Sequence, residues 1–204
     1  MTGGPFRLDF FARPCLEVAP ELLGAYLVHR LADGERLVGR IVEVEAYLGD
    51  GSDPASHAHS GPTRRNQAMF GPPGRLYVYR SYGIHTCANV VCEARGRGAA
   101  VLLRAIQPIA GTRRMRAARG LASGAPEREI ANGPGKLTQA LGVTLGDYGH
   151  SLLHGRLSLR RPARSDPPAA VARSPRVGLS KGGELPYRFY VPGNEFVSPP
   201  RRLR

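Results

Sequence analysis

Two strand-like segments joined by a tight turn constrain the fold of this chain more than any other feature. Residues 25–31 (AYLVHRL) and 36–48 (RLVGRIVEVEAYL) are rich in the apolar and β-branched side chains that favour strands. The four residues between them include Asp33-Gly34, a pair that is typical of β-hairpin turns. Because the two strands of a hairpin are antiparallel, the sequence predicts an antiparallel sheet early in the chain.

Further strands and a few short helices are predicted along the rest of the chain. Residues 75–82 and 84–92 form a second predicted strand pair with its turn at Gly83. Residues 99–108 are predicted to be a buried strand that ends at Pro108. Shorter strands are expected at residues 156–160, 176–180 and 187–191. Helices are expected at residues 17–23, 112–121 and 133–142.

The segments between these elements are predicted to be irregular. Residues 49–74 are dense in Gly, Pro, Ser, Asp and His, and a loop of this length in a compact domain is usually either functional or disordered. A surface linker is expected at 161–174 and a basic tail at 201–204. The chain shows no repeats and no βαβ alternation. We therefore expect one α+β domain over residues 1–204, built on a curved antiparallel β-sheet with flanking helices.

The chain carries a large excess of positive charge. Its formal net charge at pH 7 is +13, and an excess of this size attracts polyanions. Nearly all the cations are arginine, with lysine only at Lys136 and Lys181. A GC-rich genome explains the choice of arginine over lysine, whereas the net excess still indicates a polyanionic partner such as nucleic acid.

The sequence also indicates the compartment and the state of the cysteines. No stretch approaches the roughly 18 apolar residues that a membrane helix needs, and no signal-peptide pattern opens the chain. We therefore expect a cytoplasmic protein with no membrane partner. Cys15, Cys87 and Cys92 are odd in number and lie in apolar surroundings, so we expect buried free thiols.

The segment IVEVEAYLG, residues 41–49, contains two acids at strand spacing. Alternation predicts two sets of side chains, with Glu43, Glu45 and Tyr47 on one face and Val42, Val44 and Ala46 on the other. Two interpretations of the acidic face stay open. It is either a solvated strand face, or a cleft in which a carboxylate above an aromatic ring acts as a general base.

Three of the eight tyrosines lie within six residues, in RLYVYRSYG. Tyr77 and Tyr79 share a strand face, and Tyr82 lies at the predicted turn. Such rings pack well in a core or at a sheet edge. Interleaved with arginine in a basic protein, they also suit stacking on bases, and a ring at a turn suits insertion between base pairs.

Several other chemistries lack their motifs here. Neither His57-Ala58-His59 nor His85 with Cys87 and Cys92 forms a complete zinc set at the usual spacing, so we expect no metal. The H-x-E and P-C-x-x-C signature of zinc nucleobase deaminases is absent. So are the G-x-S-x-G, Walker A and G-x-G-x-x-G motifs, which disfavours the common hydrolases, NTPases and dinucleotide-binding enzymes.

Eight segments, in order along nearly the whole chain, are similar to one family. They are ELLGAYLVHR, IVEVEAYLG, DPASHA, RNQAMFGPPG, LYVYRSYGIHTCANVV, AAVLLRAIQP, ANGPGKLTQALG and LPYRFYVPGN. Together they resemble the alkyladenine (3-methyladenine) DNA glycosylases of the type found in mammals and many bacteria. The resemblance implies a monofunctional enzyme that flips alkylated or deaminated purines out of duplex DNA and hydrolyses their N-glycosidic bond, leaving an abasic site in base excision repair.

The resemblance also implies substrates, partners and site residues. The substrates would be 3-methyladenine, 7-methylguanine, hypoxanthine and ethenoadenine in double-stranded DNA. A monomer with no cofactor, in the bacterial cytosol or nucleoid, is implied. Glu45 matches the general base that activates a water, and Arg104 matches the arginine that helps to hold this water. The remaining matches are Tyr47, His57, Tyr79 and Asn89 in the base pocket, Tyr82 as the intercalating side chain, and Arg64, Arg65 and Lys136 at the DNA backbone.

One alternative from another class stays open, a lesion-recognition protein without catalysis that uses the same aromatic and basic residues. Glu45 separates the two hypotheses. A buried acid that faces a phosphate-rich ligand weakens binding, so its presence is hard to explain unless it activates water. A Schiff-base mechanism would need an amine, and only Lys136, Lys181 and the N-terminus offer one. We therefore expect base removal without strand cleavage.

Overall fold

A computed structural model describes residues 2–166 and 169–199 of the chain. The expected basic tail at 201–204 lies outside the described residues. The strands are β1 (Tyr26–Arg30), β2 (Arg36–Tyr47), β3 (Leu76–Ser81), β4 (His85–Cys92), β5 (Ala99–Ala110), β6 (Leu157–Arg160), β7 (Ala172–Ser174) and β8 (Arg188–Tyr190). The α-helices are α1 (Leu8–Phe11), α2 (Cys15–Glu21), α3 (Thr112–Ala118) and α4 (Pro134–Leu141). Three short 3₁₀ helices are η1 (Gln67–Phe70), η2 (Glu127–Ile130) and η3 (Leu145–Asp147).

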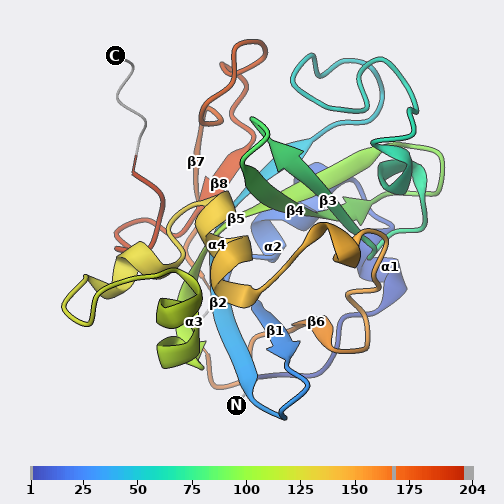
Figure 1. Ribbon diagram of the computed structural model, residues 1–204. Helices are drawn as coiled ribbons and strands as arrows, with labels where there is room; N and C mark the ends of the chain where they lie inside the picture. The colour runs from blue at the N-terminus through green and yellow to red at the C-terminus, as the bar shows by residue number, and fades with distance from the viewer. Residues whose placement is uncertain (1, 167–168, 200–204) are drawn as a thin grey trace.

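The strands form one curled antiparallel sheet in the order β3-β4-β5-β2-β1-β6 (Figure 1). Strand β2 is long enough to pair with β5 along one edge and with both β1 and β8 along the other. The hairpins expected between β1 and β2 and between β3 and β4 are both present. The predicted α+β class, with a curved antiparallel sheet and flanking helices, is confirmed.

The two faces of the sheet have different partners. One face carries apolar side chains of β2 to β5 that join a single core with helices α2, α3 and α4. Val44 and Ala46 belong to this core as predicted. Val42 instead packs in a small cluster with Ala105 and Phe196, because bulges on either side of Glu43 shift the pairing of β2 with β5. The opposite face carries the polar and aromatic residues described in the next subsection.

The predicted end of the strand at Pro108 is wrong. Strand β5 continues to Ala110, and Pro108 lies opposite Gly39. The register shifts between Val38 and Gly39, and a bulge of this kind tolerates a proline, which has no N–H to donate to the ladder.

The prediction for the C-terminal third is partly wrong. Residues 176–180, expected as a strand, are irregular, and the strand in this region is β7, inside the expected linker at 161–174. The backbone N–H of Val177 donates to the carboxylate of Glu45 and not to a neighbouring strand. Periodicity cannot reveal such a partner, because Glu45 lies 132 residues away in the sequence.

The helices follow their sequence signals closely. Helix α4 begins at Pro134 and ends before Gly142, whose φ of +68° is the left-handed conformation that glycine adopts most readily. All three cysteines are buried and free, as expected. Within the described residues, no helix is long and apolar enough to cross a membrane, and no group of three His, Cys, Asp or Glu side chains could hold a metal ion.

Candidate active site

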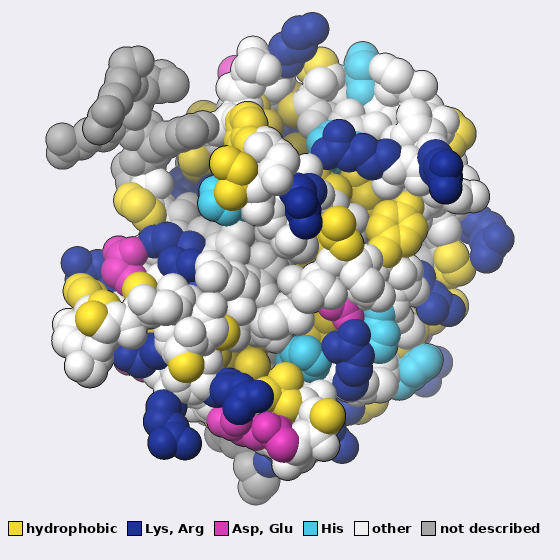
Figure 2. Space-filling view, in the orientation of Figure 1, with side chains coloured by type: hydrophobic (Ala, Val, Ile, Leu, Met, Phe, Trp, Pro, Cys, Tyr) yellow, Lys and Arg dark blue, Asp and Glu magenta, His cyan; other side chains and the backbone are white. Residues whose placement is uncertain are grey.

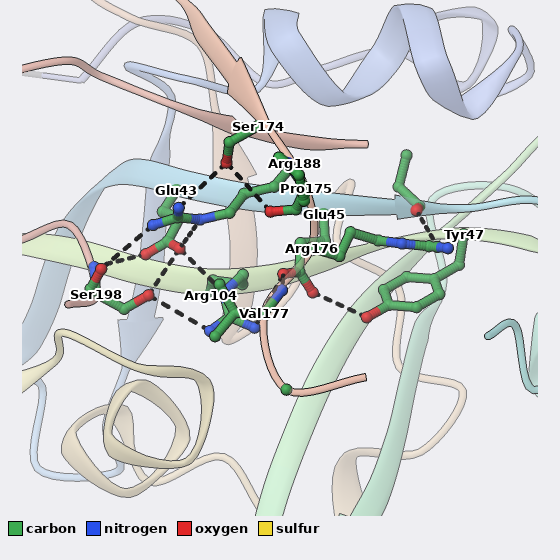
Figure 3. A network of polar contacts seen from close by, with 12 residues as sticks. Glu43, Glu45, Tyr47, Arg104, Ser174, Pro175, Arg176, Val177, Arg188 and Ser198 are labelled. Carbon is green, nitrogen blue, oxygen red and sulfur yellow. Dashed lines mark hydrogen bonds and ion pairs between the residues drawn. The ribbon is translucent and has the colours of Figure 1, made fainter. Parts of the chain in front are cut away.

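Two fully buried carboxylates share one guanidinium on the polar face of the sheet (Figure 3). Glu43 and Glu45 come from β2, and Arg104 comes from the neighbouring strand β5. The Nε of Arg104 donates to Glu43 at 3.0 Å, and its Nη1 lies 3.2 Å from Oε1 of Glu45. Because neither acid is exposed to solvent, the interpretation of this strand as a solvated face is wrong.

Glu43 accepts four hydrogen bonds and serves as a structural anchor. Besides Arg104, its oxygens accept from Arg188 Nε at 2.7 Å and from both the backbone N–H and the hydroxyl of Ser198, each at 2.7 Å. The donors lie in β5 (Arg104), in β8 (Arg188) and in the segment after β8 (Ser198) (Figure 3). A buried carboxylate that accepts from several segments in this way holds those segments together.

Glu45 has fewer partners, and three of them, Tyr47, Arg104 and Val177, line the groove described below. Its Oε1 accepts from the backbone N–H of Val177 at 2.8 Å, and its Oε2 accepts from the hydroxyl of Tyr47 at 2.8 Å. Burial, followed by the neighbouring Glu45, raises the pKa of Tyr47 well above its ordinary value, so this phenol stays protonated and donates. Burial would lower the pKa of Arg104, but Glu45 and Glu43 raise it by more, which keeps the guanidinium charged.

An aromatic pocket opens beside Glu45. It is lined by Tyr47, Ala55, His57, Met69, Tyr77, Tyr79, Asn89 and Leu179. The four residues predicted for a base pocket, namely Tyr47, His57, Tyr79 and Asn89, are therefore brought together by the fold. The rings of His57 and Tyr79 meet edge to face with centroids 4.5 Å apart, and Tyr77 stacks on Tyr79 at 5.5 Å.

Hydrogen bonds fix the walls of this pocket. His57 Nδ1 lies 2.9 Å from the hydroxyl of Tyr77, and the Asn89 amide donates to the carbonyl of Tyr77 at 3.1 Å. Burial, with a smaller effect from Arg65, lowers the pKa of His57 below its ordinary value of 6.5. His57 is therefore neutral near pH 7, and a neutral ring does not repel a cationic ligand.

The pocket opens into a wider groove that runs to the tip of the β3–β4 hairpin. The groove is lined by residues of the pocket, by Arg104 and by residues of the hairpin tip. At the tip, Tyr82 and Ile84 are 74% and 75% exposed, which is unusual for large apolar side chains. Figure 1 shows this tip between the loop that follows β2 and the loop that follows β7.

The loop after β7 forms one wall of the site. Residues 176–182 are here called the strap. Its residues Val177, Gly178 and Leu179 line the groove, and Leu179 also lines the pocket. The Tyr82 hydroxyl donates to the Gly178 carbonyl at 3.4 Å, so the strap and the hairpin tip touch across the groove.

The three basic residues predicted to contact DNA lie in different settings. Arg65 lines the groove, donates to the carbonyl of Arg80 at 3.1 Å and lies 5.7 Å from the centre of the Tyr79 ring. Arg64 is exposed but is not among the residues that line the groove. Lys136 lies in a hollow beside Tyr82 and donates to Glu129 at 2.6 Å and to Asn132 at 2.8 Å. Figure 2 shows Lys and Arg side chains spread over the whole visible face, with acidic side chains in fewer places.

Sequence reasoning missed several residues of the site. The strap residues had been predicted as a strand, and Ile84 had been assigned only to a strand. Asp53 appears in the DPASHA segment, but no role was inferred for it. The exposure of Ile84 next to Tyr82 becomes visible only once the hairpin tip is known to project from the molecule.

The comparison with known protein families agrees with this geometry. The model of the methylpurine-DNA glycosylase (MPG) family matches residues 9–195. The chain belongs to the methylpurine-DNA glycosylase family, and it is accordingly a DNA glycosylase, an enzyme of DNA repair.

Individual relatives match over almost their whole length. A protein of Methanoculleus marisnigri is 48% identical over 191 residues, which cover 93% of this chain and 96% of the relative. One of Rhodopseudomonas palustris strain HaA2 is 50% identical, covering 97% and 92%, and one of Chlorobaculum tepidum is 47% identical, covering 93% and 88%. Each of these relatives carries the name "Putative 3-methyladenine DNA glycosylase".

Proposed function

We propose that this protein hydrolyses the N-glycosidic bond of alkylated or deaminated purines in duplex DNA and leaves an abasic site. The substrate class comprises 3-methyladenine, 7-methylguanine, hypoxanthine and ethenoadenine. The observation that carries the proposal is the position of Glu45, a fully buried carboxylate that accepts a hydrogen bond from Tyr47 in the wall of the aromatic pocket. The chemistry needs a base at this position, because the water that attacks C1′ must be oriented and must lose a proton.

Glu45 is the general base and Arg104 holds its orientation. Both lone pairs of Oε1 are occupied, by Arg104 and by the N–H of Val177, whereas Oε2 has only the Tyr47 hydroxyl as partner among the described residues. A carboxylate oxygen can accept two hydrogen bonds. The second lone pair of Oε2 therefore accepts a proton from the attacking water. The water oxygen bonds to C1′, the C1′–N bond breaks, and its electron pair leaves with the base.

The aromatic pocket holds the extruded base and selects damaged purines. Tyr47, His57 and Tyr79 surround it, and their faces favour electron-poor or cationic rings such as 3-methyladenine and 7-methylguanine by stacking with cation–π character. A positively charged base is also a better leaving group, so the reaction depends mainly on the activated water. Asn89 lies at the pocket wall, where it is placed to reject the 2-amino group of guanine.

The hairpin tip inserts into the duplex to replace the flipped base. Flipping costs a few kcal/mol of stacking and pairing energy, and a wedge side chain offsets part of this cost. Tyr82 is exposed, lies at the end of the groove and has Ile84 beside it. Arg65 beside the pocket, together with Arg64 and Lys136, contacts the DNA backbone around the lesion. The protein acts on its duplex as a monomer in the cytoplasm.

The experiment that tests the proposal is single-turnover release of free base from duplexes that contain one hypoxanthine, ethenoadenine or 7-methylguanine. Wild-type protein should release the base, and Glu45→Gln should be slower by at least about a hundredfold, the scale of general base catalysis. The isosteric amide keeps the shape of the site, so binding to lesion DNA should be retained.

Two controls separate this mechanism from its alternatives. Wild type and Lys136→Ala should both release the base without cleaving the DNA strand. Strand cleavage that survives Glu45→Gln but disappears in Lys136→Ala would establish a Schiff-base mechanism instead. Tight binding to lesion DNA with no release from any lesion would show a recognition protein without catalysis.

A further inference from the structure

One buried ion pair outside the proposed reacting groups joins the strap to the loop that carries His57. The side chains of Arg176 and Asp53 are both fully buried. Nη1 of Arg176 donates to Oδ2 of Asp53 at 2.7 Å, and Nη2 donates to Oδ1 at 2.7 Å. Such a two-pronged pair has a fixed geometry, so it sets the position of both chains that it joins.

Arg176 also fixes both ends of the strap. Its Nη2 donates to the carbonyl of Gly182 at 2.8 Å, which ties the last strap residue back to the first. Its Nη1 donates to the carbonyl of Ala46 at 3.0 Å, and its guanidinium lies 4.6 Å from the centre of the Tyr47 ring (Figure 3). The same side chain therefore orients the strap and supports the tyrosine that donates to Glu45.

Asp53 orders the opposite wall in the same way. Besides the guanidinium, it accepts the backbone N–H of Leu48, which follows Tyr47, at 3.1 Å. It also accepts the N–H of Ala55, a pocket residue two positions before His57, at 3.1 Å. One carboxylate thus connects the end of strand β2, the His57 loop and the strap.

The seat of the strap leaves no free space at its far end. Gly182 has a φ of +59°, and a Cβ placed there would lie 3.1 Å from Cγ of Pro54 and 3.4 Å from Nη2 of Arg176. This close approach to the residue after Asp53 is independent of the ion pair, and it indicates that the strap is built to lie in one position.

We propose that Arg176 and Asp53 are positioning residues that hold the strap against the pocket, so that the Val177 N–H orients Glu45 and Leu179 closes on the extruded base. This inference rests on the proposed function. Without the Arg176–Asp53 ion pair, here called the clasp, the strap is free to move. Glu45 then loses a donor that defines its orientation, and the base loses one wall of its pocket. A displacement of about 1 Å at a reacting group can cost about a hundredfold in rate.

The test compares Arg176→Lys and Asp53→Asn with wild type in three measurements. These are single-turnover release of ethenoadenine, affinity for undamaged duplex, and the fluorescence change of ethenoadenine when it enters the pocket. Each variant should lose about a hundredfold in release rate and show a smaller fluorescence change. Affinity for undamaged duplex should stay within about threefold of wild type, because both substituted side chains are fully buried and the hairpin tip loses at most one long hydrogen bond, from Tyr82 to Gly178 at 3.4 Å. The double variant should be no slower than the slower single variant, since the two residues act as one unit.

Arg156→Lys is the matched control. Arg156 is half-exposed and pairs with the buried Asp147 of η3, and neither residue lines the pocket or the groove, so it reports the cost of weakening an Arg–Asp pair elsewhere in the fold. It should release ethenoadenine at the wild-type rate. If Asp53→Asn does not fold, Gly182→Ala supplies the test, because it displaces the strap and leaves both charges in place.

Several outcomes would overturn the inference. One is that Arg176→Lys and Asp53→Asn fold and release the base at near wild-type rates. Another is that their affinity for undamaged duplex falls by as much as their release rate. If wild-type protein releases no base, the proposed function fails. The fluorescence change alone then tests whether the ion pair positions the strap. Equal changes in wild type and Asp53→Asn, or no change in either, would overturn the clasp as well.

Discussion

Glu43 and Glu45 show how the surroundings of a residue decide its role. Both are glutamates on the same face of one strand, and both are fully buried beside Arg104. Glu43 binds a second arginine and Ser198, whereas Glu45 binds Tyr47, which lines the pocket, and Val177, which lines the groove. The sequence placed the two acids on one face, but the partners that distinguish them come from residues about 130 to 155 positions further along.

At the same scale, His57 should make stability depend on pH. Burial lowers its pKa below the ordinary 6.5, so the folded protein resists protonation more than the unfolded chain does. The free energy of unfolding therefore holds this contribution in full above pH 6.5 and loses it as the pH falls below that value. Urea denaturation of His57→Gln at about pH 8 and about pH 5 should show a smaller drop than in wild type.

His59→Gln is the control for this prediction. His59 is an exposed histidine that lies two residues further along the same loop. Comparing the two variants separates the loss of the His57 side chain from the general effect of a glutamine substitution in this loop. An equal drop in His57→Gln and wild type would show that His57 takes up its proton as easily in the folded protein as in the unfolded chain.

At the scale of elements, the pairing of β2 with β5 depends on Gly39. A Cβ at this position would lie 2.2 Å from Cδ1 and 2.9 Å from Cβ of Ile106, and the Ile106 Cβ cannot move without its strand. Gly39→Ala should lower the free energy of unfolding by about 1–3 kcal/mol, the usual cost of overpacking, as measured by urea denaturation. Gly124→Ala, in a loop where a Cβ would meet nothing within 4 Å, should change it by less than about 0.5 kcal/mol. Similar stabilities for the two variants would contradict a close contact between β2 and β5.

Local patterns predicted the elements well and their long-range partners poorly. Hairpin turns, strand periodicity and glycine caps are encoded within about ten residues, and the predicted β1–β2 and β3–β4 hairpins and helix α4 are present. The run of β5 through Pro108 depends on the bulge at Gly39, about 70 residues earlier in the chain. The strap had the composition of a strand, yet its backbone is bound by Glu45 and its first side chain by Asp53. The residues of the pocket came from family resemblance, because no local rule places Tyr47, His57 and Asn89 around one space.

At the scale of the whole molecule, the charge of +13 should appear in the salt dependence of DNA binding. Affinity for duplex DNA should fall with salt at a log–log slope of about −0.9 for each phosphate neutralised. Arg65 lines the groove, so Arg65→Ala should reduce the magnitude of this slope by about 1. The measurement is fluorescence anisotropy of a labelled undamaged duplex over a series of salt concentrations.

Arg30→Ala is the whole-molecule control. Arg30 ends strand β1, which lies next to the sheet edge opposite the β3–β4 hairpin, and it lines a separate surface hollow. Its loss should leave the slope unchanged if the duplex lies along the groove. Equal effects of the two substitutions would mean that DNA binds over the surface without a preferred face.

The hydrogen bond between Glu45 and Val177 also sets an order of events during synthesis. Its two ends are separated by 132 residues, and a ribosome adds roughly 5–20 residues each second. Glu45 therefore leaves the ribosome on the order of ten seconds before the strap that completes its surroundings. Both hairpins, β1–β2 and β3–β4, are therefore synthesised before the strap that completes the surroundings of Glu45.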